Sequence, residues 1–242
     1  RSCKFMLTEE AHHMFVGETG VDRIVKRSAE LVRADKNGEA RAQGGVNLDT
    51  IQKYINRWYC LSLDLFGGEI SSNAADYFAT GLKGRYRESQ LGEHAALEQA
   101  YDMHVLEAGR LVRQEVPLRN AMNEVLRDAY ISDCQRAVDK WNKTLAAAGV
   151  DEFRFQLPSR RFFRRIGIYA DQPFDPEGNL LSHPEYEQHL QRWLPSAQDE
   201  RDIAALQQAP IYTPGQMAHW IAPPSRGINS QPLNFEYVKR AA

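Results

Sequence analysis

Over most of the first 150 positions apolar residues recur with the helical period of about 3.6 residues, which predicts several packed α-helices. Glycines and Asp/Asn-Gly turns divide the pattern into separate helices. The expected helices cover residues 3–32, with a hesitation at Gly17 and Gly20, then 49–65, 72–82 and 120–148, the last being the longest.

A β-hairpin is expected between the last two helices. Residues 105–116 place two apolar segments on either side of Ala108-Gly109, a pattern that fits two antiparallel strands better than a helix. The first 149 residues are therefore predicted to form helices of one bundle with a short hairpin.

Residues 150–242 are expected to form an irregular extension packed on this bundle, because prolines and glycines become frequent. The tail over 208–242 keeps too many large apolar residues for a disordered end and is expected to lie as a strap on the globule. Short elements are expected at about 152–157, 183–193 and 197–207.

Composition excludes several classes of protein. The 242 residues are 43% hydrophobic, and no apolar stretch approaches the roughly 18 residues needed to cross a bilayer, so no membrane role is expected. A net charge of −2 argues against nucleic acid as a partner. The three cysteines, Cys3, Cys60 and Cys134, are far apart and without CxxC spacing, which indicates thiols in a reducing cytoplasm.

Glu10 and His13 form a candidate metal-binding pair. Residues three apart on a helix lie about 60° from each other around its axis, so the carboxylate and the imidazole can converge on one ion. The alternative is an ordinary ion pair of Glu9 with His12 or His13 on a solvated face.

Apolar bulk surrounds this pair in the sequence. Met6, Met14 and Phe15 could line a pocket beside a metal, although core packing is the preferred interpretation of each.

Four segments of the sequence carry a resemblance to a known family: Leu7–Gly20, Leu63-Asp64-Leu65-Phe66-Gly67, Asn123–Asp128 and Trp220-Ile221-Ala222-Pro223-Pro224. With them the chain resembles the oxygenase components of benzoyl-CoA 2,3-epoxidases, and this resemblance covers essentially the whole chain. A more distant resemblance, to the catalytic subunit of phenylacetyl-CoA epoxidase, covers the first helix and the Phe66-Gly67 turn.

The resemblance implies the C-terminal part of a ferritin-like di-iron helical bundle. Glu10 and His13 match the family's last Glu-x-x-His, which would bind iron, and the ligands from three preceding helices would lie upstream of Arg1. The sequence is accordingly expected to be a piece of a longer protein.

Other acids and histidines are not assigned as ligands, because none stands in an acid-x-x-His pattern. We expect structural roles for Asp64, Glu69, Glu93, His94 and His104. Asp64, near the end of an apolar helix, could still orient a ligand.

The activity implied by the resemblance is that of an oxygen-dependent monooxygenase with two iron ions. A separate NADPH-dependent flavin and iron-sulfur reductase would supply electrons. One atom of O₂ would enter the 2,3 bond of the aromatic ring of benzoyl-CoA as an epoxide, in aerobic benzoate degradation, and the other would leave as water.

Coenzyme A carries phosphates, which draws attention to basic clusters. In a helical turn, Arg160 with Arg164 and Arg161 with Arg165 would form like-charged pairs that an anion relieves. The preferred alternative is that these arginines pair with acids or stack over aromatic rings. Lys83, Arg85 and Arg87 form a second candidate cluster.

Two other classes of function stay open from the sequence. One is a di-iron protein with another substrate, such as a phenylacetyl-CoA epoxidase-like acyl-CoA oxygenase or a ribonucleotide-reductase-like radical subunit. The other is a non-catalytic helical module.

Overall fold

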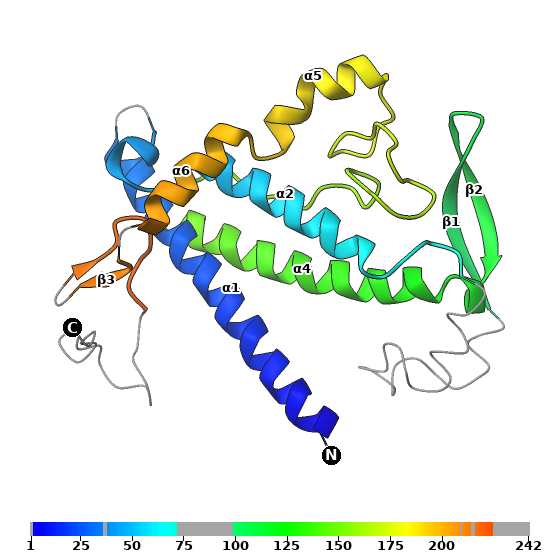
Figure 1. Ribbon diagram of the computed structural model, residues 1–242, viewed down its shortest axis with the longest axis horizontal. Helices are drawn as coiled ribbons and strands as arrows, with labels where there is room; N and C mark the ends of the chain where they lie inside the picture. The colour runs from blue at the N-terminus through cyan, green and yellow to red at the C-terminus, as the bar shows by residue number, and fades with distance from the viewer. Residues whose placement is uncertain (1, 36–37, 72–98, 209, 214–215, 225–242) are drawn as a thin grey trace. The chain divides into compact units, whose positions relative to one another are not determined.

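The computed structural model describes residues 2–35, 38–71, 99–208, 210–213 and 216–224 (Figure 1). The described part is mainly α and contains the predicted hairpin, together with a second, two-residue antiparallel pair, β3 with β4, that was not predicted. Its helices are α1 (Ser2–Ala34), α2 (Leu48–Asp64), α4 (Met122–Ala147), α5 (His183–Trp193) and α6 (Ala197–Gln208); its strands are β1 (Ala100–Glu107), β2 (Arg110–Pro117), β3 (Tyr212–Thr213) and β4 (Gln216–Met217).

Helix α1 is continuous, and the predicted hesitation at Gly17 and Gly20 is wrong. Each glycine costs a helix about 1 kcal/mol relative to alanine, which burial of Val25 and Ala29 further along the helix offsets. With 33 residues α1 exceeds the 26 of α4, so the expectation that the helix over 120–148 would be the longest is also wrong.

Glycines end the helices where the sequence predicted. Gly38, Gly67 and Gly149 follow α1, α2 and α4 with φ values of 70°, 84° and 77°, a left-handed conformation that glycine adopts without steric cost. The predicted helix over 72–82 lies outside the described residues.

The hairpin is confirmed and is longer than predicted. β1 and β2 pair antiparallel from Ala100↔Pro117 to Glu107↔Arg110. Ala108 and Gly109, with φ of 46° and 77°, form the two-residue turn that suits the twist of the strands.

The short element predicted over 152–157 is wrong, because side chains satisfy the backbone there. The amide of Asn142 donates to the carbonyl of Phe155 and accepts from its N–H, at 2.9 and 2.8 Å. Gln52 makes the same two bonds with Gln156, at 2.7 and 2.9 Å. The elements predicted near 183–193 and 197–207 are confirmed as α5 and α6.

Part of the predicted strap is described, and it lies on α1. Arg23 Nε donates to the carbonyl of Ala222 at 2.6 Å, and Arg27 Nε donates to that of His219 at 2.8 Å. Residues 225–242 lie outside the described part.

Two compact units make up the chain. Unit 1 contains residues 1–54, 136–156 and 191–242, and unit 2 contains 55–135 and 157–190. The predicted division after residue 149 stays a prediction. Among the described residues, no helix is both long and apolar enough to cross a bilayer.

Asp199, at the start of α6, is a buried carboxylate of unit 1 that pairs with two basic side chains. Its carboxylate accepts hydrogen bonds from Ser196 N at 2.9 Å and Lys53 Nζ at 3.0 Å, and from the side chains of Thr50 and Arg41 at 3.2 Å each. Burial alone would raise the pKa of this carboxyl, but the bonds from Ser196 and Lys53 outweigh it and hold the pKa well below its usual range.

We expect Asp199→Asn to lower the free energy of unfolding by about 2–4 kcal/mol at pH 7, because Lys53 and Arg41 lose a buried partner. A depressed carboxyl pKa stabilises the fold above the unfolded pKa of about 4, and this contribution is lost as pH falls toward the folded pKa. The urea midpoints at pH 7 and pH 3.5 should therefore differ less from each other in the variant than in the unaltered protein.

Asp202→Asn is the control, because Asp202 also pairs with Arg41, at 2.8 Å, but its side chain is 28% exposed against 7% for Asp199. Equal effects of the two substitutions would contradict the role given to Asp199.

Candidate metal centre

Glu10 and His13 lie on one side of α1, as predicted. The Oε2 atom of Glu10 is 3.7 Å from Nδ1 of His13, and the side chains are 68% and 64% exposed. An oxygen and a nitrogen donor at this spacing can bind the same iron ion, since carboxylate and imidazole are both iron ligands. The pair thus fits the ion that the resemblance implies.

The apolar residues near the pair are exposed. Met6, Met14 and Phe15 have 64%, 65% and 63% of their surface exposed, so the preferred interpretation that they pack in a core is wrong for the described part of the chain. A helix segment that exposes three large apolar side chains beside two candidate metal ligands has the composition of a surface that packs against another part of a protein.

Helix α4 holds α1 in place within unit 1. Lys140 Nζ donates to the Glu18 carboxylate at 2.5 Å, and Trp141 Nε1 donates to the Glu18 carbonyl at 3.3 Å. One turn further, Thr144 Oγ1 donates to Asp22 at 2.6 Å. These contacts begin at Glu18, five residues after His13, so the candidate pair lies before the part of α1 that α4 contacts in this way.

Within the described residues, no group of three histidine, cysteine or acidic side chains is arranged to bind a metal ion. Glu93 and His94 lie outside that part. Asp64 and Glu69 bind arginines, in keeping with the structural roles expected of them. The backbone carbonyl of His104 accepts from the Tyr169 hydroxyl, and the structural role expected of its side chain stays a prediction.

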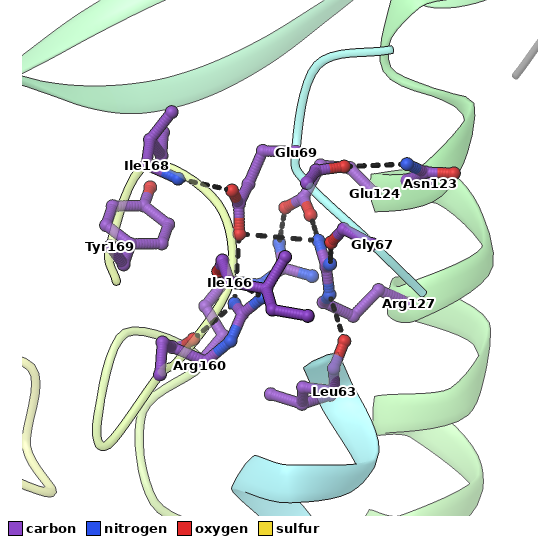
Figure 2. A network of polar contacts seen from close by, with 12 residues as sticks. Leu63, Gly67, Glu69, Asn123, Glu124, Arg127, Arg160, Ile166, Ile168 and Tyr169 are labelled. Carbon is purple, nitrogen blue, oxygen red and sulfur yellow. Dashed lines mark hydrogen bonds and ion pairs between the residues drawn. The ribbon is translucent and has the colours of Figure 1, made fainter. Parts of the chain in front are cut away.

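These two carboxylates belong to a buried ionic cluster in unit 2. Arg164 Nε donates to Asp64 at 2.6 Å, and its Nη1 lies 3.0 Å from Glu69. Arg127 lies 3.7 Å from Glu69 and forms a close ion pair with Glu124, one helical turn before it. Figure 2 shows Glu69, Glu124 and Arg127 pointing toward one another.

Backbone groups complete the cluster. Arg127 donates to the carbonyls of Leu63 at 3.2 Å and Gly67 at 2.5 Å, which caps the end of α2. Burial, followed by the positive charge of Arg164, lowers the pKa of Arg127 to about 10, so it stays charged at neutral pH. The cluster therefore fixes the turn after α2.

Arg160 connects the cluster to the hairpin. It lies 3.3 Å from Glu124, forms a close pair with Asp128, and donates to the Tyr101 hydroxyl at 3.3 Å. Tyr101 in turn donates to Asp128 at 2.7 Å; burial and this bond raise its pKa to about 12.

The preferred interpretation of the arginine run is confirmed. Arg160 and Arg164 pair with acids, whereas Arg161 stacks 5.9 Å from the ring of Tyr169 and Arg165 lies 4.6 Å from that of Phe163. The helical turn assumed for the like-charged pairs is absent from this described segment, because Phe163 adopts φ of 48°. Lys83, Arg85 and Arg87 lie outside the described residues.

The participation of Glu124 and Arg127 in a buried ionic cluster was not predicted from the sequence. The signal was present: an acid and an arginine three residues apart within an apolar helical pattern form an intrahelical pair. Their partner Glu69 lies more than fifty residues away and had no local signature.

The fold and the Glu-x-x-His pair together define a mainly helical protein compatible with a carboxylate and histidine metal bundle. No protein-family model matches the chain. The predicted resemblance is confirmed by a curated relative from Aromatoleum evansii named benzoyl-CoA oxygenase component B, which is 44% identical over 243 residues. This similarity covers 99% of the chain but only 51% of the relative, so the chain spans about half of its length.

Proposed function

We propose that the chain is the C-terminal part of the ferritin-like oxygenase component of a di-iron benzoyl-CoA 2,3-epoxidase. The observation that carries the proposal is the Glu10–His13 pair, 3.7 Å apart on an exposed helix of a chain 44% identical to a benzoyl-CoA oxygenase component. The relative's name supports an oxygenase role in benzoyl-CoA metabolism, and the chemistry of the pair supports iron as the metal.

Glu10 and His13 would hold iron through a carboxylate oxygen and an imidazole nitrogen. An iron pair held there would supply the reductive activation of O₂. The remaining ligands would come from the half of the oxygenase component that this chain does not span. Met6, Met14 and Phe15, exposed beside the pair, would form an apolar wall that accepts the aromatic ring and excludes water.

Two partners follow from this proposal. A separate NADPH-dependent reductase with flavin and iron-sulfur groups would deliver electrons, in keeping with the word component in the relative's name. Phosphate groups of benzoyl-CoA would bind arginines of the 160–165 run; Arg165 is best placed, because its side chain is 57% exposed, whereas Arg164 is 1% exposed and neutralised by acids.

The decisive experiment compares two Glu-x-x-His pairs on the same turn of α1 in the full-length oxygenase component. Glu10→Ala and His13→Ala should each lower iron affinity by more than about tenfold, since even residues that only support a ligand are worth that much. Iron per chain is measured by metal analysis after dialysis against a weak chelator, and epoxide formation from benzoyl-CoA with O₂ and reductase is followed in parallel.

Glu9→Ala and His12→Ala are the matched control, because these residues have the same spacing and are also exposed. Both should keep the iron content of the unaltered protein. Loss of iron from the control pair, with retention in the Glu10 and His13 variants, would refute the assignment. Iron without epoxide from benzoyl-CoA would instead favour a di-iron oxygenase for another acyl-CoA.

A further inference from the structure

Helix α2 carries apolar side chains on two sides, and one of these sides is exposed. Tyr59 and Leu63 are buried in unit 2, with 6% and 0% of their surface exposed. Trp58 is 60% exposed and Leu65 is 87% exposed, with half-buried Leu61 between them. Trp58 and Leu61 lie one turn apart on α2, and Leu65 is the first residue after the helix, where its N–H donates to the carbonyl of Ser62 at 3.2 Å and continues the last turn. We call these three residues the α2 outer face.

The α2 outer face is free of exposed charge. From Trp58 to Phe66 the only charged residue is Asp64, which is 8% exposed and bound to Arg164. Arg57, at the edge, lies 6.0 Å from the ring of Trp58. Exposed helix faces of ordinary surfaces carry charged and polar residues, so an uncharged stripe with a tryptophan is typical of a contact surface.

The end of α2 that displays this face is held firmly in place. Arg127 donates to the carbonyls of Leu63 and Gly67, and Asn123 Nδ2 donates to that of Gly68 at 2.7 Å (Figure 2). Leu65 lies between the two carbonyls that Arg127 binds. Its outward direction therefore belongs to a fixed turn and not to a fraying helix end.

We propose that the α2 outer face is covered, in the full-length oxygenase component, by the half of the protein that this chain does not span. This inference rests on the proposed function. The relative is about twice as long as the chain, so a full-length protein built like the relative holds a second part of similar size that can cover some of this surface.

The chemistry of the face favours this permanent cover over a transient partner. Permanent interfaces resemble a domain core cut in half and are apolar, whereas transient electron-transfer contacts are small. Trp58 and Leu65 are exposed, and residues 58–66 carry no exposed charge. This composition is that of a permanent interface.

The test measures the accessibility of position 65 in the full-length protein. Leu65→Cys is treated with a maleimide, and labelling is quantified on the peptide by mass spectrometry, which separates it from native Cys3, Cys60 and Cys134. Val112→Cys is the control, because Val112 is an apolar hairpin residue that is only 39% exposed here. We expect labelling at position 65 to be at least about tenfold slower than at 112 in native protein and equal in urea. Equally fast labelling at both positions in native protein would overturn the proposal.

The occupant is identified with a photo-reactive benzophenone amino acid placed at position 65. Cross-links to peptides of the other half of the same molecule support the proposal. Three other outcomes would overturn the proposal. Cross-links to these 242 residues would identify the chain itself as the occupant, and protection that disappears on dilution to monomer would identify a second copy. Protection that appears only with the reductase would identify the reductase.

Iron content of the unaltered full-length protein is measured alongside. Protection at position 65 in a protein that binds no iron would leave the docking surface standing and refute only the metal assignment.

Discussion

Arg164→Met is expected to lower the free energy of unfolding by about 3–5 kcal/mol, because it removes one member of a buried ionic cluster and leaves its partners charged. Arg164 is 1% exposed and binds Asp64 at 2.6 Å and Glu69 at 3.0 Å. Methionine fills much of the same volume, so the loss reports the charge and not a cavity. The measurement is the urea midpoint at constant slope.

The adjacent residue provides the control. Arg165 also pairs with an acid, Asp171, at 3.2 Å, but the two side chains are 57% and 74% exposed. Exposed ion pairs contribute at most about 1 kcal/mol, so Arg165→Met should change the midpoint little. Similar losses from the two neighbouring arginines would show that burial of the cluster does not determine its contribution.

The cluster also explains which parts of the fold the sequence could predict. Helices α1, α2 and α4 follow from apolar periodicity and from glycines at their ends, which are local signals. The hairpin follows from Ala108-Gly109 between apolar segments. The path of residues 157–182 depends instead on contacts such as Arg164 with Asp64, which lie 100 positions apart and leave no periodic pattern.

The approach of the Glu10 and His13 side chains to each other was predictable from a local signal, whereas their metal binding stays a prediction. Glu10 and His13 are three residues apart, so helix geometry alone brings them together. The exposure of Met6, Met14 and Phe15 was not predictable, because hydrophobic side chains on a helix normally indicate the side that faces a core. Here the hydrogen bonds between α1 and α4 given for the described residues begin at Glu18, and no local pattern distinguishes the covered part of the helix from its exposed part.

Burial of the ionic cluster has a steric consequence at one glycine. Gly167 adopts φ of 89°, and a Cβ atom there would lie 1.8 Å from Oε2 of Glu69, the oxygen that accepts the hydrogen bond of Ile168 N at 2.7 Å. Because Arg164 and Arg127 hold the same carboxylate, Glu69 has little freedom to withdraw. A methyl group at this position must therefore displace a carboxylate that the whole cluster shares.

Gly167→Ala is expected to cost about 4 kcal/mol or more, the sum of left-handed backbone strain and a broken buried ion network. Gly109→Ala is the control, because Gly109 has a similar φ of 77° but no atom within 4 Å of the added Cβ, so about 1 kcal/mol of strain is all it should show. Urea unfolding of both variants separates the two contributions. If Gly167→Ala were no more destabilising than Gly109→Ala, Glu69 would be free to move, and the cluster would not be the rigid support that fixes the turn after α2.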